Sequence, residues 1–395
     1  MSYVAAIATY LPRWGAAGRR AAGGDEDAVT LAVQAGRAAI EAAGAGGEGV
    51  QRVVLVSRDL PLIEGGNAAV LLAGLGLGPE IEVDERLGGA PAALDEVTAA
   101  RPRTLVIAAD MRPAGAAAAL ASVAGLTVRP LARLARSLPT RARNAAGTVH
   151  DYGDPRLLRE RGLLASLAAV GAEKPLALAG VDAEQAKALC AGTPPKLPTT
   201  GASSALFALA ALAESRATGP LFATEQATVT GVAVSGGPAT VRREEPAARP
   251  LPATTCTEGK DIPVSLAAYD RAFEPKVRFE AARHPDTGEL DFPPRFRVGR
   301  DGTLGSDYTL VPLPRTGTVY TGVTVRIPVP GLPTPYSLVI VELDDVGVRV
   351  LARVTGTEPG TVTIGDRGRM VLRRVAVRSG VPDYGYAFSP EETTA

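Results

Sequence analysis

The chain has 395 residues, which is enough for two or three domains and a large hydrophobic core. Apolar residues make up 46% and charged residues 21%, a composition that excludes an intrinsically disordered chain. Because the 42 basic and 42 acidic side chains cancel, the net charge is zero, which argues against nucleic acid or an anionic membrane as the main partner.

Cysteine and histidine are too scarce for most thiol and metal chemistry. The chain holds two cysteines, Cys190 and Cys256, and two histidines, His150 and His284. This inventory excludes a disulfide framework and a cysteine-based metal site, and it indicates a cytoplasmic protein. We expect Cys190 to be a buried core thiol, Cys256 to have no role, and His150 to be a hydrogen-bonding loop residue. Neither a secretion signal nor a membrane span is expected, since no apolar run reaches about 18 residues.

Residues 1–235 alternate apolar strands with helices, which predicts an α/β domain whose sheet is covered on both faces. The acidic residues at 25–27 are expected to cap a helix that carries Val29, Val33 and Ile40 on one face. The first half, about 1–125, has predicted strands at 3–9, 53–57, 81–84 and 104–109 and further helices at 67–77 and 91–100.

A second α/β half covers about 126–235, after a strand expected at 115–120. Its predicted strands lie at 126–134, 175–179, 221–224 and 227–234, and its helices at 156–170, 183–191 and 201–214. The repeated strand–helix scheme suggests two related halves. Residues 236–264 are rich in proline and lack apolar periodicity, so they are interpreted as a linker.

The last part of the chain is predicted to be all β. Residues 318–327 alternate in the period-2 pattern of a half-buried strand, with Val319, Val323 and Ile327 on one face. Further strands are expected at 336–343, 348–355, 361–364 and 369–377. Five short strands separated by Asp/Gly turns favour a small barrel of the OB type.

Residues 83–94 have the order strand, Gly88-Gly89 turn, then a helix from Pro91. This order is typical of a nucleophile elbow, where a reactive side chain stands on a tight turn at a helix N-terminus. The residue at the apex is Leu87, which offers no nucleophilic, acidic, basic or ligating atom.

Residues 1 to about 235 resemble the thiolase-like superfamily, in particular 3-hydroxy-3-methylglutaryl-CoA synthases and β-ketoacyl synthase III. The resemblance implies an αβαβα layered fold that dimerises through a sheet edge and makes or breaks C–C bonds on acyl-CoA. It is carried by residues 6–12, 27–39, 85–94, 104–110, 115–120, 151–155 and 201–212.

The catalytic positions implied by this resemblance are vacant. The family has its acyl-carrying cysteine in Glu-Ala-Cys-Tyr-Gly-Ala, whereas residues 85–90 read Glu-Arg-Leu-Gly-Gly-Ala, so Leu87 takes its place. Arg58 stands where the general-acid glutamate falls, and Leu178 and Ala179 stand where the histidine falls. Thioester formation needs an activated thiolate, so the family reaction is not expected.

The pocket implied by the resemblance could still hold a CoA thioester without any covalent cofactor. Arg58 is expected to form a structural ion pair with Asp59 or Glu85, and the alternative is that it binds a carboxylate or phosphate of a ligand. The residues implied to line this pocket are Arg58, Leu87, Gly88, Gly89 and Gly201.

The region from about 270 resembles the acyl-CoA-associated zinc-ribbon/OB-fold family, through the segments 292–295, 316–320, 335–336, 341–343 and 364–366. We assign residues 265–315 to a degenerate ribbon and 316–395 to the OB-fold domain. In that family two Cys-x-x-Cys pairs hold zinc, which is not expected here. The corresponding positions are His284, Thr287, Val298 and Asp301.

Two functions of different classes remain open. The favoured one is a catalytically silent subunit, a homodimer or hetero-oligomer, that binds acyl-CoA or scaffolds an active thiolase or synthase partner. The alternative is a CoA-thioester aldolase or acyltransferase in which Tyr152 or Tyr308 moves protons, which needs strong tuning of a tyrosine pKa near 10. A ligand sensor or a nucleic-acid binder is a more distant alternative.

Overall fold

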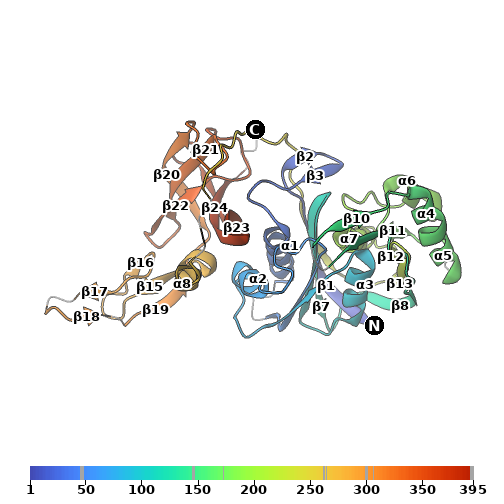
Figure 1. Cartoon of the computed structure of the whole chain (residues 1–395). Helices are drawn as coiled ribbons and strands as arrows, with labels where there is room; N and C mark the ends of the chain where they lie inside the picture. The colour runs from blue at the N-terminus through green and yellow to red at the C-terminus, as the bar shows by residue number, and fades with distance from the viewer. Residues whose placement is uncertain are drawn as a thin grey trace. The chain divides into compact units, whose positions relative to one another are not determined.

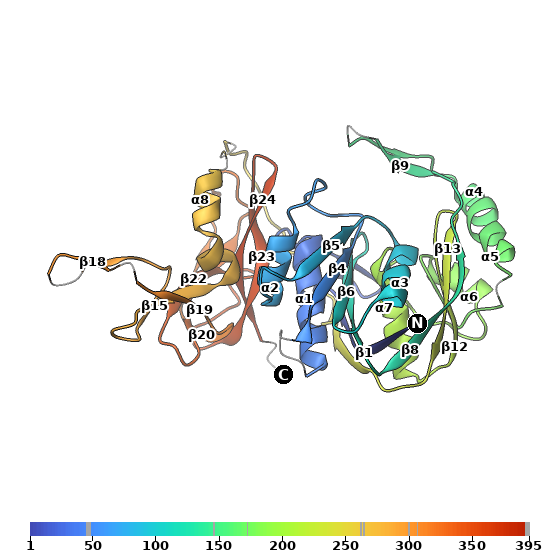
Figure 2. The same ribbon diagram turned by 90° about the horizontal axis from the view of Figure 1, so that it is seen from below.

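The computed structural model describes residues 1–44, 49–144, 147–171, 173–260, 263, 265–298, 301–305 and 307–391. The chain divides into two compact units, shown in two views in Figures 1 and 2. The first unit comprises Met1–Ala22 and Leu31–Arg249, and the second comprises Gly23–Thr30 and Pro250–Ala395. Among the described residues, no helix combines the length and the apolar character that crossing a bilayer requires.

A ten-stranded sheet forms the first unit, in the order β11-β12-β13-β8-β1-β7-β6-β4-β5, with β14 paired to β1. Most of its strands are rich in Val, Leu, Ile and Ala and are buried on both faces, whereas β5, β8 and β14 are largely half-buried or exposed. They are β1 (Ser2–Tyr10), β4 (Arg52–Val56), β5 (Glu82–Arg86), β6 (Thr104–Met111), β7 (Ala114–Ser122), β8 (Leu126–Leu134), β11 (Ala177–Ala179), β12 (Gly219–Glu225), β13 (Thr228–Ser235) and β14 (Thr240–Glu244). Two hairpins lie outside the sheet, β2 (Trp14–Ala16) with β3 (Arg19–Ala21) and β9 (Arg141–Arg143) with β10 (Val149–Asp151).

The helices of this unit form layers around the sheet (Figure 2). One large core cluster joins α3 and α7 to strands of both halves, whereas a smaller cluster joins η2 and α6 to the far face of β11, β12 and β13. The result is the αβαβα layering that the sequence predicts. The helices are α1 (Ala28–Ala42), α2 (Ala68–Leu75), α3 (Ala90–Ala99), α4 (Pro155–Leu157), the π-helical η2 (Leu158–Leu164), α5 (Ala165–Ala169), α6 (Ala183–Leu189) and α7 (Ser203–Glu214).

The two halves of the sheet repeat one pairing pattern. In the first half β4 is parallel to β6, which is antiparallel to β7, which is antiparallel to β1. In the second half β11, β12, β13 and β8 follow each other with the same three orientations. The halves join where β1 and β8 pair antiparallel. Helix α3, which precedes β6, and helix α7, which precedes β12, therefore hold equivalent places, and they pack against each other.

The second unit contains a five-stranded antiparallel sheet in the order β22-β21-β20-β23-β24. An isolated bridge between Val354 and Phe388 connects the β22 end to β24, and this closes the sheet around one apolar core. The closed five-stranded barrel confirms the predicted fold class, α/β followed by an OB-type domain. Its strands are β20 (Thr316–Val325), β21 (Tyr336–Leu343), β22 (Arg349–Arg353), β23 (Arg367–Arg378) and β24 (Val381–Pro390).

Short elements precede the barrel. Strand β15 (Glu280–Arg283) pairs with β16 (Leu290–Asp291) and β19 (Thr309–Pro312), and β17 (Arg297–Val298) pairs with β18 (Leu304–Gly305). Helix α8 (Leu266–Arg271) and the π-helical η3 (Glu274–Arg278) come before them. These helices were not predicted, because Ala and charged residues dominate them and leave no apolar stripe.

The predicted linker at 236–264 is partly a strand. Within it, Thr240–Glu244 forms β14, which pairs in parallel with Ala6–Tyr10 of β1. The strand has only one apolar residue, Val241, which packs against the large core cluster. Parallel pairing to the buried strand β1 explains why these residues form a strand, which the apolar periodicity of the sequence could not indicate. Residues 261, 262 and 264 of the predicted linker lie outside the described residues.

The predicted strand at 361–364 is wrong. These residues form a turn in which Thr363 donates its amide and its hydroxyl to the carboxylate of Asp366. The fifth barrel strand is β24, which the sequence analysis did not predict because Pro382 and Asp383 interrupt the apolar pattern. It follows β23 directly through Ser379 and Gly380, both at positive φ, the conformation that tight hairpins favour.

The one-face alternation predicted for 318–327 holds only at its start. Val319 is buried, but a bulge between Val319 and Thr321 shifts the register of β20 against β21. An inserted residue moves every later side chain to the other face of the sheet. Val323 is therefore exposed instead of buried, and Ile327, which lies beyond the end of β20, is exposed as well.

The segment Gly23–Thr30 makes buried polar contacts within the second unit. The Tyr384 hydroxyl donates to Oδ2 of Asp27 at 2.8 Å, while Oδ1 of Asp27 accepts the Thr30 amide at 3.0 Å. The Arg373 guanidinium lies 3.2 Å from the carboxylate of Glu26. The expected acidic cap is thus present, because Asp27 accepts the Thr30 amide and, with its other oxygen, the Tyr384 hydroxyl.

Replacing Tyr384 by Phe tests the buried hydrogen bond between Tyr384 and Asp27. Burial, together with the Asp27 carboxylate, raises the pKa of Tyr384, so its hydroxyl remains a donor at neutral pH. Removing that donor from a buried carboxylate is expected to lower the free energy of unfolding by about 1–3 kcal/mol in urea titrations. Tyr152→Phe, at an exposed position, should change it by less than about 0.5 kcal/mol. Equal stability of the two variants would contradict the assignment.

Candidate functional site

The N-terminus of α3 is occupied by a carboxylate from a distant strand. The amide of Gly89, the residue before α3, donates to Oε2 of Glu225 at 2.7 Å. Glu225 is the last residue of β12 and also forms an ion pair with Arg58. A Cβ on Gly89 would lie 2.6 Å from both the Arg58 guanidinium and the Glu225 carboxylate, so only glycine leaves room for this pair.

The N-terminus of α7 is occupied in the same way. The buried carboxylate of Asp110, near the end of β6, accepts the amides of Ala202 and Ser203, each at 2.8 Å. The Ser203 hydroxyl donates to it as well, at 2.5 Å, and lies 2.8 Å from the Thr199 hydroxyl. All these groups are fully or nearly buried. Two amides at the start of α7 therefore have an acceptor from within the chain.

The two caps are reciprocal. The strand that follows α3 supplies Asp110 to α7, and the strand that follows α7 supplies Glu225 to α3. The repeat of the two halves explains this, because it places each strand end beside the opposite helix. Helix N-termini attract anions through their free N–H groups and dipole. Here the protein's own carboxylates take both positions.

Burial shifts the titration of both charged groups in this region. It raises the pKa of Asp110, against the hydrogen bonds from Ser203 and Ala202, which favour the ionised form. It lowers the pKa of Arg58, although the nearby Asp110 and Asp59 carboxylates favour the charged form. The site thus brings the Arg58 guanidinium together with the carboxylates of Glu225, Asp110 and Asp59.

The expected ion pair of Arg58 forms with a different partner. Arg58 binds Glu225 rather than Asp59 or Glu85. Asp59 instead accepts the Met111 amide at 3.0 Å. Glu85 is held by the start of α2, where it accepts the amides of Asn67 and Ala68 at 3.1 and 3.0 Å. Glu225 was missed because it lies 136 residues from Gly89 and no local pattern marks it.

The other predicted pocket residues are only partly brought together. Arg58 and Gly89 meet at Glu225, and Gly201 lies against Asp110, where a Cβ would come within 2.0 Å of Oδ1. Leu87 lies at the start of α3 but its side chain is 57% exposed. Leu178 is 1% exposed and belongs to the small outer cluster, whereas Ala179 belongs to the large cluster around α3 and α7. Successive strand residues point to opposite faces, so Leu178 does not line the site.

The remaining single residues have no catalytic surroundings among the described residues. Cys190 is buried in the outer cluster, as expected, and burial raises the pKa of its thiol to about 11, which keeps it protonated and unreactive. Cys256 and Tyr152 are exposed, and His150 is an exposed residue of β10. The ring of Tyr308 lies 6.2 Å from those of His284 and Phe296.

The four vacant zinc-ligand positions do not fit a zinc ion. Val298 has no donor atom, and the carboxylate of Asp301 accepts the amide and hydroxyl of Thr303. His284 lies against the buried carboxylate of Asp291 at 2.9 Å. Among the described residues no group of three or more His, Cys, Asp and Glu side chains could hold a metal.

An ionic cluster lies at the position of the ribbon instead. Besides His284, the Asp291 carboxylate binds Arg297 at 2.7 Å and Arg295 at 3.0 Å. The arginines, and then the histidine, hold the pKa of Asp291 well below its usual range. This cluster connects β16 and β17 with His284, the residue after β15.

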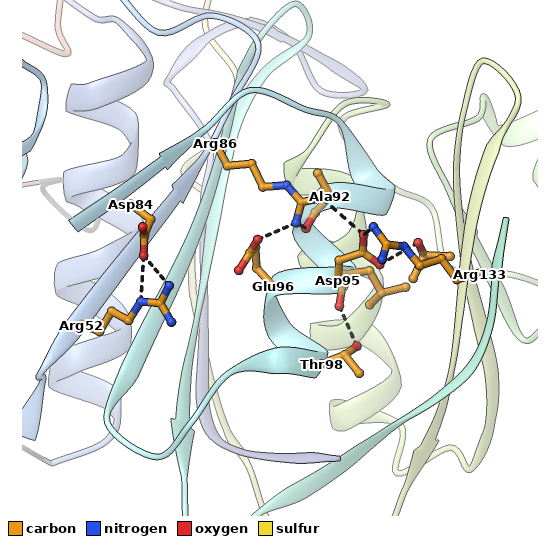
Figure 3. Close-up of polar contacts among 10 residues, drawn as sticks. Arg52, Asp84, Arg86, Ala92, Asp95, Glu96, Thr98 and Arg133 are labelled. Atoms are coloured by element: carbon orange, nitrogen blue, oxygen red, sulfur yellow. Dashed lines mark hydrogen bonds and ion pairs between the residues drawn. The ribbon is translucent and has the colours of Figure 1, made fainter. Parts of the chain in front are cut away.

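A cleft of about 580 Å³ runs beside the outer face of α3, between that helix and strands β8 and β13. Figure 3 shows Arg86, Asp95, Glu96 and Arg133 gathered there. Asp95 lies 3.3 Å from both Arg86 and Arg133 and accepts the Thr230 hydroxyl at 2.9 Å. None of the predicted pocket residues lines this cleft. Its apolar wall comes from Met1, Pro130, Leu131, Ala132 and Val232.

The C-terminal region matches known proteins in sequence. Residues 310–373 match the family described as the C-terminal OB-fold domain of ChsH2. A DUF35 domain-containing scaffold protein of Methanothermobacter thermautotrophicus is 39% identical over 59 residues, which is 14% of this chain and 44% of that protein. The chain thus spans less than half the length of this curated relative.

Solved structures resemble about 60% of the chain at low sequence identity. A variant of OleA from Xanthomonas campestris has a TM-score of 0.47 and 15% identity, covering 60% of this chain and 99% of that one. The 3-oxoacyl-[acyl-carrier-protein] synthase III of Aquifex aeolicus has a TM-score of 0.45 and 15% identity, with 60% and 100% covered. The corresponding synthase of Pseudomonas aeruginosa gives 0.44 and 16%, with 61% and 99% covered.

Replacing Gly201 by Ala tests the buried cap of α7. The new methyl group would displace the Asp110 carboxylate and leave buried N–H groups of α7 without an acceptor. Thermal or urea unfolding should show a loss of about 2–4 kcal/mol. Gly18→Ala is the matched control, because a Cβ there meets nothing within 4 Å. If both variants unfold alike, the cap does not contribute as described.

Proposed function

We propose that this chain is a non-catalytic subunit that binds acyl-CoA and scaffolds a thiolase or synthase partner that makes or breaks C–C bonds. One observation carries the proposal: the helix start where a nucleophile is expected has Leu87 and an internal carboxylate, Glu225. A condensing enzyme needs free N–H groups there to stabilise an oxyanion. A carboxylate beside those groups opposes both a thiolate and an oxyanion.

The C-terminal domain supports the scaffolding part of the proposal. Its sequence matches the OB-fold domain of ChsH2, and the curated relative is named a scaffold protein. The ionic cluster around Asp291 would keep the ribbon ordered without zinc. A domain that keeps its shape but has no reactive group suits a partner-holding role.

The ligand and the assembly belong to the same proposal. A CoA thioester would bind beside Arg58, whose side chain is 43% exposed despite its ion pair. Edge strand β5 offers unpaired backbone groups for a second subunit, either another copy or the active partner. The scarcity of cysteine suits a cytoplasmic complex.

Intact-protein mass spectrometry after incubation with acetyl-CoA tests the catalytic part. We expect no covalent acetyl adduct on the wild-type chain, while a cysteine-containing β-ketoacyl synthase treated in parallel becomes acetylated. Titration calorimetry on the same sample should show acetyl-CoA binding without turnover. A stable acetyl group on any residue, or the absence of binding, would reject the proposal.

A further inference from the structure

Positive charge is concentrated in one part of this electrically neutral chain. Residues 126–164, which we call the basic arm, contain eight arginines and no lysine, against the acidic residues Asp151, Asp154 and Glu160. The rest of the chain is therefore net acidic. The arm comprises β8, the β9–β10 hairpin, α4 and η2. Figure 2 shows the β9 hairpin standing clear of the sheet of its unit.

The acidic residues of the arm are engaged locally. Asp151 accepts the Gly153 amide at 2.9 Å, and Asp154 caps α4 by accepting the Leu157 amide at 2.9 Å. Glu160 forms an ion pair with Arg156. Within the described residues, five exposed arginines of the arm have no ion pair: Arg129, Arg141, Arg143, Arg159 and Arg161.

The arm is fixed at its base. Gln226, next to the capping residue Glu225, accepts the Thr140 amide at 3.1 Å and donates to the Arg141 carbonyl. The Arg136 guanidinium donates to the Ser166 hydroxyl at 3.1 Å. The arginines are thus presented on an ordered support, which lowers the entropy lost when they bind.

Apolar side chains are exposed among these arginines. Leu131, Val149 and Tyr152 are exposed, and β8 also forms one wall of the cleft beside α3. Arginine with tyrosine and aliphatic side chains is the composition of protein–protein contact surfaces. A nucleic acid would gain little from the aliphatic groups, and it would be repelled by the net acidic remainder of the chain.

We propose that the basic arm is the docking surface for an acidic segment of a partner protein, and that the adjoining cleft receives an apolar side chain of that segment. The inference rests on the proposed function in one respect: the proposed function requires a partner protein, and the basic arm is the surface that would hold it. Complementary charge would speed association and fix the orientation of the partner.

Fluorescence anisotropy with the full-length chain tests the proposal. The probe is a labelled synthetic peptide of glutamates with interspersed leucines, compared with an all-glutamate peptide and an oligouridine RNA. We expect the Glu/Leu peptide to bind best, by about fivefold over the all-glutamate peptide, and its binding to weaken as salt is added. Arg141→Glu/Arg143→Glu/Arg159→Glu should weaken this binding at least about tenfold.

Two matched triple variants control for charge and folding. Arg19→Glu/Arg101→Glu/Arg216→Glu changes the net charge equally at exposed positions outside the arm, and should weaken binding less than about twofold. Replacing Arg141, Arg143 and Arg159 by Lys keeps the charge and should preserve binding. The proposal is overturned if the peptide does not bind, if both Glu triples lose binding equally, if the Lys triple loses it, or if RNA binds more tightly through the arm. These results do not depend on acyl-CoA, so they are separable from the acetylation test.

Discussion

The reciprocal capping of α3 and α7 is the constraint on which the first unit depends. Each central helix starts in the buried layer between the two halves of the sheet, where its free N–H groups need acceptors. Asp110 and Glu225 provide them, each from the strand that follows the opposite helix. The same contacts that supply acceptors to the two helix starts also join the two halves.

The caps also bear on the proposed non-catalytic role. Leu87 offers no nucleophilic atom, and at the same helix start Glu225 accepts the Gly89 amide and pairs with Arg58, which would make that amide less available to an oxyanion. The segment before the barrel also contains an internal ionic cluster, in which the buried carboxylate of Asp291 binds His284, Arg295 and Arg297.

Much of the fold followed from apolar strands alternating with helices, because buried parallel strands leave a continuous Val/Leu/Ile signal. The sequence could not reveal β14, which has one large apolar side chain. It could not reveal β24 either, because a proline and an aspartate interrupt the apolar pattern of that strand. The site was harder to predict. The Gly-Gly turn identified the start of α3, but the residues that decide its chemistry lie 136 and 92 positions away from the groups they bind. An acidic residue ending the strand after each central helix is the one signal that could have indicated them.

A Leu87→Cys variant treated with acetyl-CoA tests the central claim most directly. Because the position is exposed, iodoacetamide should alkylate the new thiol and show that it is accessible. Because Glu225 binds the Gly89 amide and Arg58, the proposed non-catalytic role predicts that the variant stays free of a covalent acetyl group by intact-protein mass spectrometry. Stoichiometric acetylation of the new cysteine would contradict the account.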